Sequence, residues 1–69
     1  MLYTKRTLEK KVNGKWIIDD TSEDNEYINI MLVDELTGKF LFKNDVRSIK
    51  YSYGKITVNY TTTFRAIYE

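Results

Sequence analysis

The last third of the chain alternates between apolar and polar residues on either side of one glycine, Gly54. A two-residue type II′ turn at Gly54-Lys55 is predicted there, because glycine suits the first central position of that turn. Apolar residues would then face one another: Tyr53 with Ile56, Tyr51 with Val58, and Ile49 with Tyr60. The other face would hold only polar pairs: Ser52 with Thr57, Lys50 with Asn59, and Ser48 with Thr61. Because side chains alternate between the two faces of a strand, this pattern predicts a hairpin with one buried and one exposed face.

A second hairpin is predicted near the start of the chain, in the stretch TLEKKVNGKWIID, because Asn-Gly is a favoured turn pair. A three-residue loop that ends at Gly14 would pair Leu8 with Ile18 and Lys10 with Trp16. The N-terminal strand would then form a sheet edge that its lysines protect from association. Turn residues recur at short intervals along the chain, which is typical of a small all-β domain.

The middle segment, EYINIMLVDELTGKFLF, has two interpretations. As two strands, residues 26–33 and 39–43 would pair across DELTG, and the first strand would be apolar on both faces. As a helix, Ser22 would be the N-cap and Gly38 the end, and one face would carry Ile28, Met31, Leu32 and Leu36. We favour the strands, because Asn29, Asp34 and Glu35 leave such a helix without a clean polar side.

The predicted fold is a single small domain over residues 1–69. It is all-β, an antiparallel roll or barrel of five to six strands built from hairpins. The alternative is an α+β fold in which a helix near residues 22–37 packs on an antiparallel sheet.

The composition removes most catalytic chemistry. The chain has no cysteine and no histidine, so it offers no disulfide, no thiolate or imidazole nucleophile or base, and no ordinary zinc site. Its three glycines are too far apart for a phosphate-binding or dinucleotide-binding loop. The acidic stretch DDTSEDNE lacks the residue spacing of a calcium loop. We therefore expect no enzyme activity, no cofactor and no metal.

The net charge of +1 hides a segregation of charge along the chain. Residues 1–15 hold five bases and one acid, residues 16–38 seven acids and no base, and residues 39–69 six bases and two acids. The acidic patch consists of Asp19, Asp20, Glu23, Asp24 and Glu26. The polar face of the C-terminal hairpin is a candidate partner-binding surface, made of Lys50, Lys55, Thr57, Asn59, Thr61, Thr63 and Arg65. The aromatic residues of the opposite face are expected in the core: Tyr51, Tyr53, Tyr60 and Phe64.

These features predict a non-enzymatic protein-binding module, such as a small inhibitor or adaptor that acts on a host protein. Heavy use of Lys, Asn, Ile and Tyr indicates an AT-rich genome, which suits a phage or mobile element. The alternative is a small nucleic-acid-binding barrel that uses the basic, hydroxyl-rich face, although a pI near 7.9 is low for that class.

The partner expected from this sequence is a protein, with nucleic acid as the alternative. Surplus apolar surface on the middle segment also raises the hypothesis of a homodimer. No apolar run has the length of a signal peptide or a membrane span, so we expect a soluble, cytoplasmic protein that does not contact a membrane.

Overall fold

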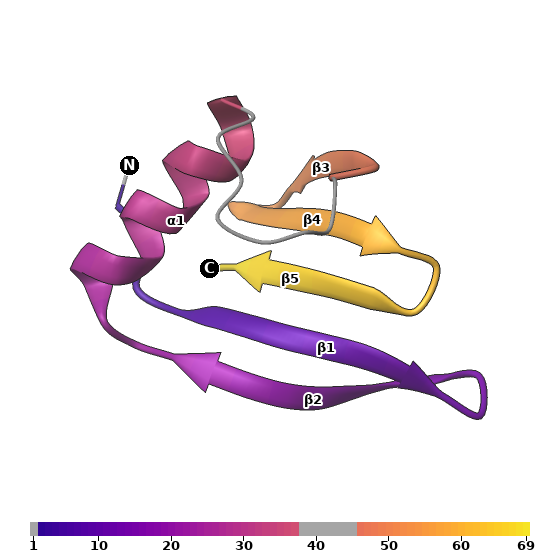
Figure 1. The fold of residues 1–69 in the computed structure, drawn as a ribbon. Helices are drawn as coiled ribbons and strands as arrows, with labels where there is room; N and C mark the ends of the chain where they lie inside the picture. Colours follow the sequence, from indigo (N-terminus) through magenta and orange to yellow (C-terminus); the bar gives the residue numbers. More distant parts are fainter. Residues whose placement is uncertain (1, 38–45) are drawn as a thin grey trace.

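One antiparallel sheet and one helix make up the part of the protein that the structure, a computed structural model, describes, namely residues 2–37 and 46–69 (Figure 1). The elements in chain order are β1 (Arg6–Val12), β2 (Lys15–Ser22), α1 (Asn25–Thr37), β3 (Ser48–Ser52), β4 (Lys55–Thr61) and β5 (Phe64–Tyr68). Across the sheet the strand order is β2-β1-β5-β4-β3. The first strand therefore pairs with the last, and the expectation that the N-terminal strand is an edge is wrong, because β1 lies between β2 and β5.

The middle segment is a helix, so the structure takes the α+β alternative and the strand predicted over residues 26–33 is wrong. The helix buries Ile28, Met31, Leu32 and Glu35, which have the spacing of one helical face. Leu36, predicted on that face, is 43% exposed, and Glu35 takes the expected place in the core. Tertiary packing of this stripe on the sheet decides the element type. The strand predicted over residues 39–43 lies outside the described residues.

Asp24 caps the N-terminus of α1. Its Oδ1 accepts a hydrogen bond of 3.1 Å from the backbone N–H of Tyr27, which satisfies one of the free donors of the first turn. The predicted cap, Ser22, instead accepts a hydrogen bond of 3.4 Å from the N–H of Asp24. The predicted end of the helix, Gly38, lies outside the described residues.

The core lies between α1 and one face of the sheet. The helix contributes Ile28, Met31 and Leu32, and the strands contribute Ile56, Val58, Tyr60, Ala66 and Tyr68. Of the four rings expected in the core, Tyr60 is buried and Phe64 is half-buried against it. Tyr51 and Tyr53 are 67% and 101% exposed, so their predicted burial is wrong. Tyr51 lies on β3, an edge strand of the sheet, and Tyr53 lies in the turn that follows it.

The β3–β4 hairpin turns one residue earlier than predicted, at Tyr53-Gly54. Both turn residues have positive φ, 52° and 77°, which identifies a type I′ turn rather than type II′. The pairing therefore differs by two residues from the prediction: Tyr51 with Ile56, Ile49 with Val58, Ser52 with Lys55, Lys50 with Thr57 and Ser48 with Asn59. Because a shift of two residues keeps every side chain on its face, the same residues form the apolar face and the polar face as predicted.

The β1–β2 hairpin has the same kind of turn, at Asn13-Gly14, again with φ of 52° and 77°. The loop therefore has two residues instead of the predicted three, and Trp16 pairs with Lys11. The predicted partners of Leu8 and Lys10 are accordingly wrong. An irregularity between Leu8 and Glu9 also shifts the register along β1.

Candidate binding surfaces

The outer face of the sheet, opposite α1, carries most of the predicted partner-binding residues. On β4, Ile56 and Val58 point into the core, so Thr57 and Asn59 point away from the helix. Cross-strand pairs extend this face over the neighbouring strands in two rows. One row holds Glu9, Arg65, Asn59 and Ser48, and the other holds the buried Thr7, Ile67, Thr57 and Lys50.

Side-chain hydrogen bonds join two pairs of neighbours in the first row. Arg65 Nε donates to Glu9 Oε1 over 2.7 Å, and Asn59 Nδ2 donates to the Ser48 hydroxyl over 3.3 Å. The Arg65 guanidinium carbon also lies 4.0 Å from the centre of the Trp16 ring, within the range of a cation–π contact. Arg65 is thus held by an acid on β1 and a ring on β2.

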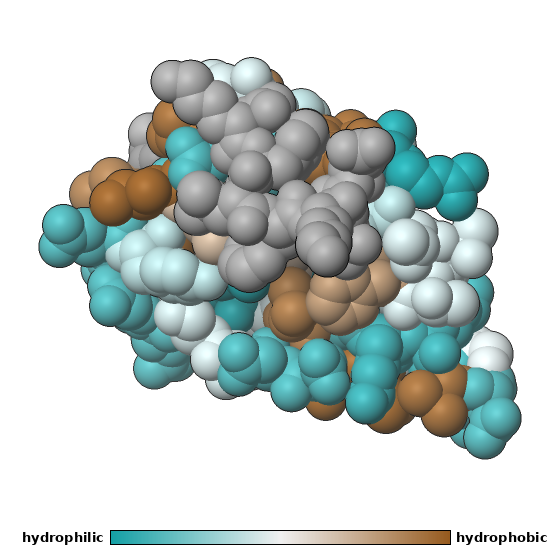
Figure 2. All heavy atoms as spheres, viewed as in Figure 1, coloured by the Kyte–Doolittle hydropathy of each residue, from teal (hydrophilic) through white to brown (hydrophobic). Residues whose placement is uncertain are grey.

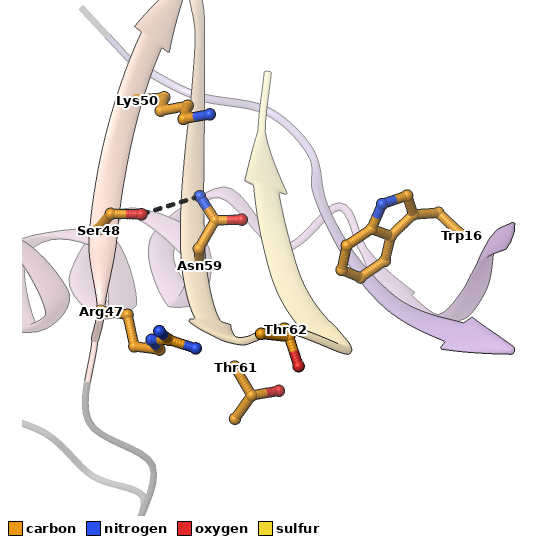
Figure 3. Close-up of a pocket in the computed structure, with 7 residues that line it drawn as sticks. All are labelled: Trp16, Arg47, Ser48, Lys50, Asn59, Thr61 and Thr62. Carbon is orange, nitrogen blue, oxygen red and sulfur yellow. Dashed lines mark hydrogen bonds between the residues drawn. The ribbon is translucent and has the colours of Figure 1, made fainter. Parts of the chain in front are cut away.

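A groove of about 340 Å³, open to solvent, runs across this face (Figure 3). Its walls are formed by Trp16, Arg47, Ser48, Lys50, Asn59, Thr61 and Thr62. Trp16 on β2 and Arg47 before β3 point toward each other from opposite ends of the groove. Among the residues that the structure describes, no acidic side chain lines the groove, and hydroxyl and amide groups lie beside its two cations.

The seven predicted partner-binding residues do not form one compact site. Lys50, Asn59 and Thr61 line the groove, and Thr57 and Arg65 lie beside it on the same face. The other two do not line the groove. Thr63 occupies the β4–β5 turn, where its hydroxyl lies 3.3 Å from that of Thr61, and Lys55 lies at the opposite end of β4, 3.8 Å from Glu69.

Sequence reasoning missed four residues of the groove: Trp16, Arg47, Ser48 and Thr62. Trp16 comes from the other hairpin, and it reaches this face only because β1 pairs with β5. A two-residue Asn13-Gly14 turn would have placed Trp16 opposite Lys11, on the same face as Glu9. The pairing of the first strand with the last had no sequence signal.

The predicted acidic patch follows the end of β2 and the start of α1, and its five members are exposed: Asp19, Asp20, Glu23, Asp24 and Glu26. Asp19 pairs with Lys10 at 3.4 Å, and Asp20 accepts a hydrogen bond from the backbone N–H of Thr21. Within residues 2–37 and 46–69, the acids gather nowhere into a group of three or more that could hold a metal ion.

A third surface is the outer side of α1, which carries four large apolar side chains. Tyr27, Ile30, Val33 and Leu36 follow one another at three-residue spacing and are 42%, 55%, 56% and 43% exposed. Hydrophobic atoms accordingly appear beside hydrophilic ones over the helix at the left of the view (Figure 2). The charged residues of the helix are all acids, Glu26, Asp34 and the buried Glu35, with no lysine or arginine.

A buried polar cluster joins α1 to the sheet but offers no site to a ligand. Arg6 donates hydrogen bonds to the hydroxyls of Tyr68 and Tyr60, at 3.0 and 3.2 Å, and pairs with Glu35 at 3.4 Å. Burial and the hydrogen bond to Glu35 raise the pKa of the Tyr60 phenol well above its ordinary value. Burial also raises the pKa of Tyr68, against the opposing attraction of the Arg6 guanidinium. Because all four residues are at most 9% exposed, the cluster serves the fold.

Comparison with protein-family models, curated proteins and solved structures finds no match to this chain. In the described part of the chain, no helix is both long enough and apolar enough to cross a membrane.

Proposed function

We propose that this protein is a non-enzymatic protein-binding module and that the outer side of α1 is its contact surface. The observation that carries the proposal is the row of exposed apolar side chains at residues 27, 30, 33 and 36. A helix that packs one side against a sheet normally presents polar residues to solvent. Contiguous exposed apolar surface of this kind marks sites where a second protein binds.

The charges around this row specify the chemistry of the partner. Glu26 and Asp34 are neighbours of Ile30 on the helix surface, four residues before and after it. Glu23 and Asp24 extend the negative charge past the N-terminus of α1. Complementary charge across an interface steers association and selects the partner. The partner is therefore a protein with an apolar surface bordered by lysine or arginine.

A second copy of this chain fits the surface less well. In a two-fold dimer the same patch occupies both sides of the interface. The acids of α1 would then face the acids of its copy without a base on either helix, and like charges in contact oppose binding. A phage or mobile-element inhibitor or adaptor that acts on a host protein is the setting we propose.

The test compares protein capture by the wild-type chain and by the double variant Ile30→Ser, Val33→Ser. Both side chains are more than half exposed, so the variant is expected to fold. Each protein carries an affinity tag and is cross-linked in a lysate of the source cells or their host, and captured proteins are identified by mass spectrometry. The identified partner is then purified and its Kd measured.

We expect the double variant to bind the partner roughly tenfold or more weakly, since it removes two apolar side chains from the contact. The matched control is Ile18→Ser, which removes an isoleucine that is 63% exposed on β2 and should leave the affinity unchanged. Higher salt should weaken binding. Equal capture by the double variant, or a captured partner whose contact surface is acidic, would contradict the proposal.

A further inference from the structure

We infer that the groove on the outer face of the sheet binds single-stranded nucleic acid. This site lies on the opposite side of the sheet from α1 and does not depend on the protein-binding role proposed above. Three features support it: unpaired cations, neutral hydrogen-bonding groups beside them, and an aromatic ring at one end of the groove (Figure 3).

Arg47 and Lys50 give the groove positive charge. In the part of the chain that the structure describes, Arg47 and Lys50 in its walls and Lys11 beside Trp16 form no ion pair. Glu9, an acid on the same face of the sheet, is bound to Arg65 at 2.7 Å. Free cations of this kind bind phosphates and release the counterions that surround them.

The uncharged side chains of the groove match the rest of a nucleotide backbone. Ser48, Thr61 and Thr62 offer hydroxyls, and Asn59 offers an amide, beside Arg47 and Lys50. Such groups make most of the contacts that proteins form with phosphate and sugar. The volume of about 340 Å³ lies within the range of small-ligand sites, so part of a strand fits while the open ends let the strand continue.

Trp16 favours a nucleic acid over an acidic protein and a single strand over a duplex. The ring is half-buried at the groove, with the Arg65 guanidinium carbon 4.0 Å and Lys11 Nζ 5.4 Å from its centre. Aromatic rings and guanidinium planes both stack on unpaired bases. An acidic peptide needs the cations but not the ring, and a duplex keeps its bases stacked on each other.

The experiment uses the full chain and the oligonucleotide dT12, labelled with fluorescein for anisotropy and unlabelled for fluorescence quenching. Trp16 is the single tryptophan, so its emission reports stacking directly. We expect dT12 to bind at 50 mM NaCl and to quench Trp16. The slope of log K against log salt should be about −2, from three free cations at about 0.7 each.

Four variants separate charge from stacking. Arg47→Ala and Lys50→Ala should each make the slope shallower by about 0.7. Trp16→Ala should lower the affinity for labelled dT12 about tenfold while leaving the slope unchanged. The matched control Lys15→Ala removes one exposed lysine that does not line the groove, and should leave both quantities unchanged. Far-UV circular dichroism verifies that each variant folds.

The comparison ligands are a twelve-base-pair duplex and polyglutamate of matched charge. We expect both to bind more weakly than dT12 and to leave Trp16 emission unquenched. The inference is overturned by an absence of dT12 binding at 50 mM NaCl, by a duplex or polyglutamate that binds as tightly as dT12, or by a Lys15→Ala effect equal to that of Lys50→Ala. The helix variant Ile30→Ser, Val33→Ser should bind dT12 like the wild type, so the two proposals fail separately.

Discussion

The hydroxyl of Tyr68 donates a hydrogen bond of 2.8 Å to Oε2 of Glu35 and so ties the last strand to the helix inside the core. Tyr60 donates to the other carboxylate oxygen, Oε1, and Arg6 supplies the compensating charge. Among the described residues, no buried side-chain polar atom lacks a hydrogen-bond partner. A fully satisfied polar network of this kind specifies one position of the helix on the sheet.

Removal of the Glu35 carboxylate should be severely destabilising. Glu35→Ala leaves Arg6 as a buried cation without its partner, and breaking a buried ion pair in this way costs about 3–5 kcal/mol. At about 0.05–0.15 kcal/mol per residue, a chain of 69 residues has a total stability of about 3–10 kcal/mol. We therefore expect Glu35→Ala to unfold at much lower urea than the wild type, or to be unfolded without urea, as measured by circular dichroism.

The exposed Glu23 provides the control, because Glu23→Gln should change the free energy of unfolding by less than about 0.5 kcal/mol. A double-mutant cycle with Arg6→Met and Glu35→Leu isolates the pair itself. The double variant should lose less stability than the two single variants together, since no charge is left buried. Additive losses would show that the two charges do not depend on each other.

The alternation of apolar and polar residues predicts which face of a hairpin strand is buried, but it does not predict where the chain turns. Ile56, Val58 and Tyr60 are buried on one face and Thr57 and Asn59 lie on the other, as their alternation predicted. The turn position was wrong because two-residue turns place glycine first in type II′ and second in type I′, and the sequence permits both. The pairing of β1 with β5 joins residues about 60 positions apart, which no local pattern encodes.

In α1, the periodicity of apolar residues does not decide between a helix and a strand. Ile28, Met31 and Leu32 mark its buried side, but Ile30 and Val33 on the outer side make the segment apolar all around, as a buried strand would also be. Glu35 belongs to the buried stripe, seven residues after Ile28. A charged residue is nevertheless expected at the surface unless a buried partner for it is known. The features that hid the helix from prediction, its outer apolar side chains, are those that we propose bind a partner.

The protein should lose stability steeply at alkaline pH. Below about pH 10, Tyr60 and Tyr68 are protonated in both the folded and the unfolded chain, so their contribution to the free energy of unfolding is fully present. The folded-state pKa values of both phenols are raised, so at higher pH the unfolded chain ionises first and binds fewer protons than the folded one. Stability then falls with rising pH, by about 2–3 kcal/mol between pH 9 and pH 11 for the two phenols together.

Urea unfolding at pH 9, 10 and 11 measures this loss, and absorbance at 295 nm follows the phenolates. We expect two of the six tyrosines to ionise only as the circular dichroism of the folded state disappears. Tyr60→Phe removes one of the two buried phenols. The loss of unfolding free energy with rising pH that these phenols cause should therefore be about half as large in this variant. Ionisation of all phenols in a chain that stays folded would contradict the assigned pKa directions.

The two type I′ turns give a matched pair for the last prediction. Asn13 and Tyr53 occupy the same turn position with the same φ of 52°, a region that asparagine tolerates and tyrosine disfavours. Tyr53 is fully exposed, so its ring adds no packing that would offset the strain. Tyr53→Asn should therefore raise stability by about 0.5–1 kcal/mol, or about 2–8 °C in Tm, in a thermal melt. The reverse change, Asn13→Tyr, should lower it by a similar amount.

Tyr51→Asn is the control for this prediction, because residue 51 is also exposed but lies within β3, where asparagine is a poorer strand former and should give no gain. A Tyr53→Asn variant that melts below the wild type would mean that the ring makes a stabilising contact in solution. A gain in Tm would mean that folding does not require a tyrosine at this turn. The strained and exposed ring at the tip of the β3–β4 hairpin would then be a candidate for a contact outside the chain, since such positions gather at functional surfaces.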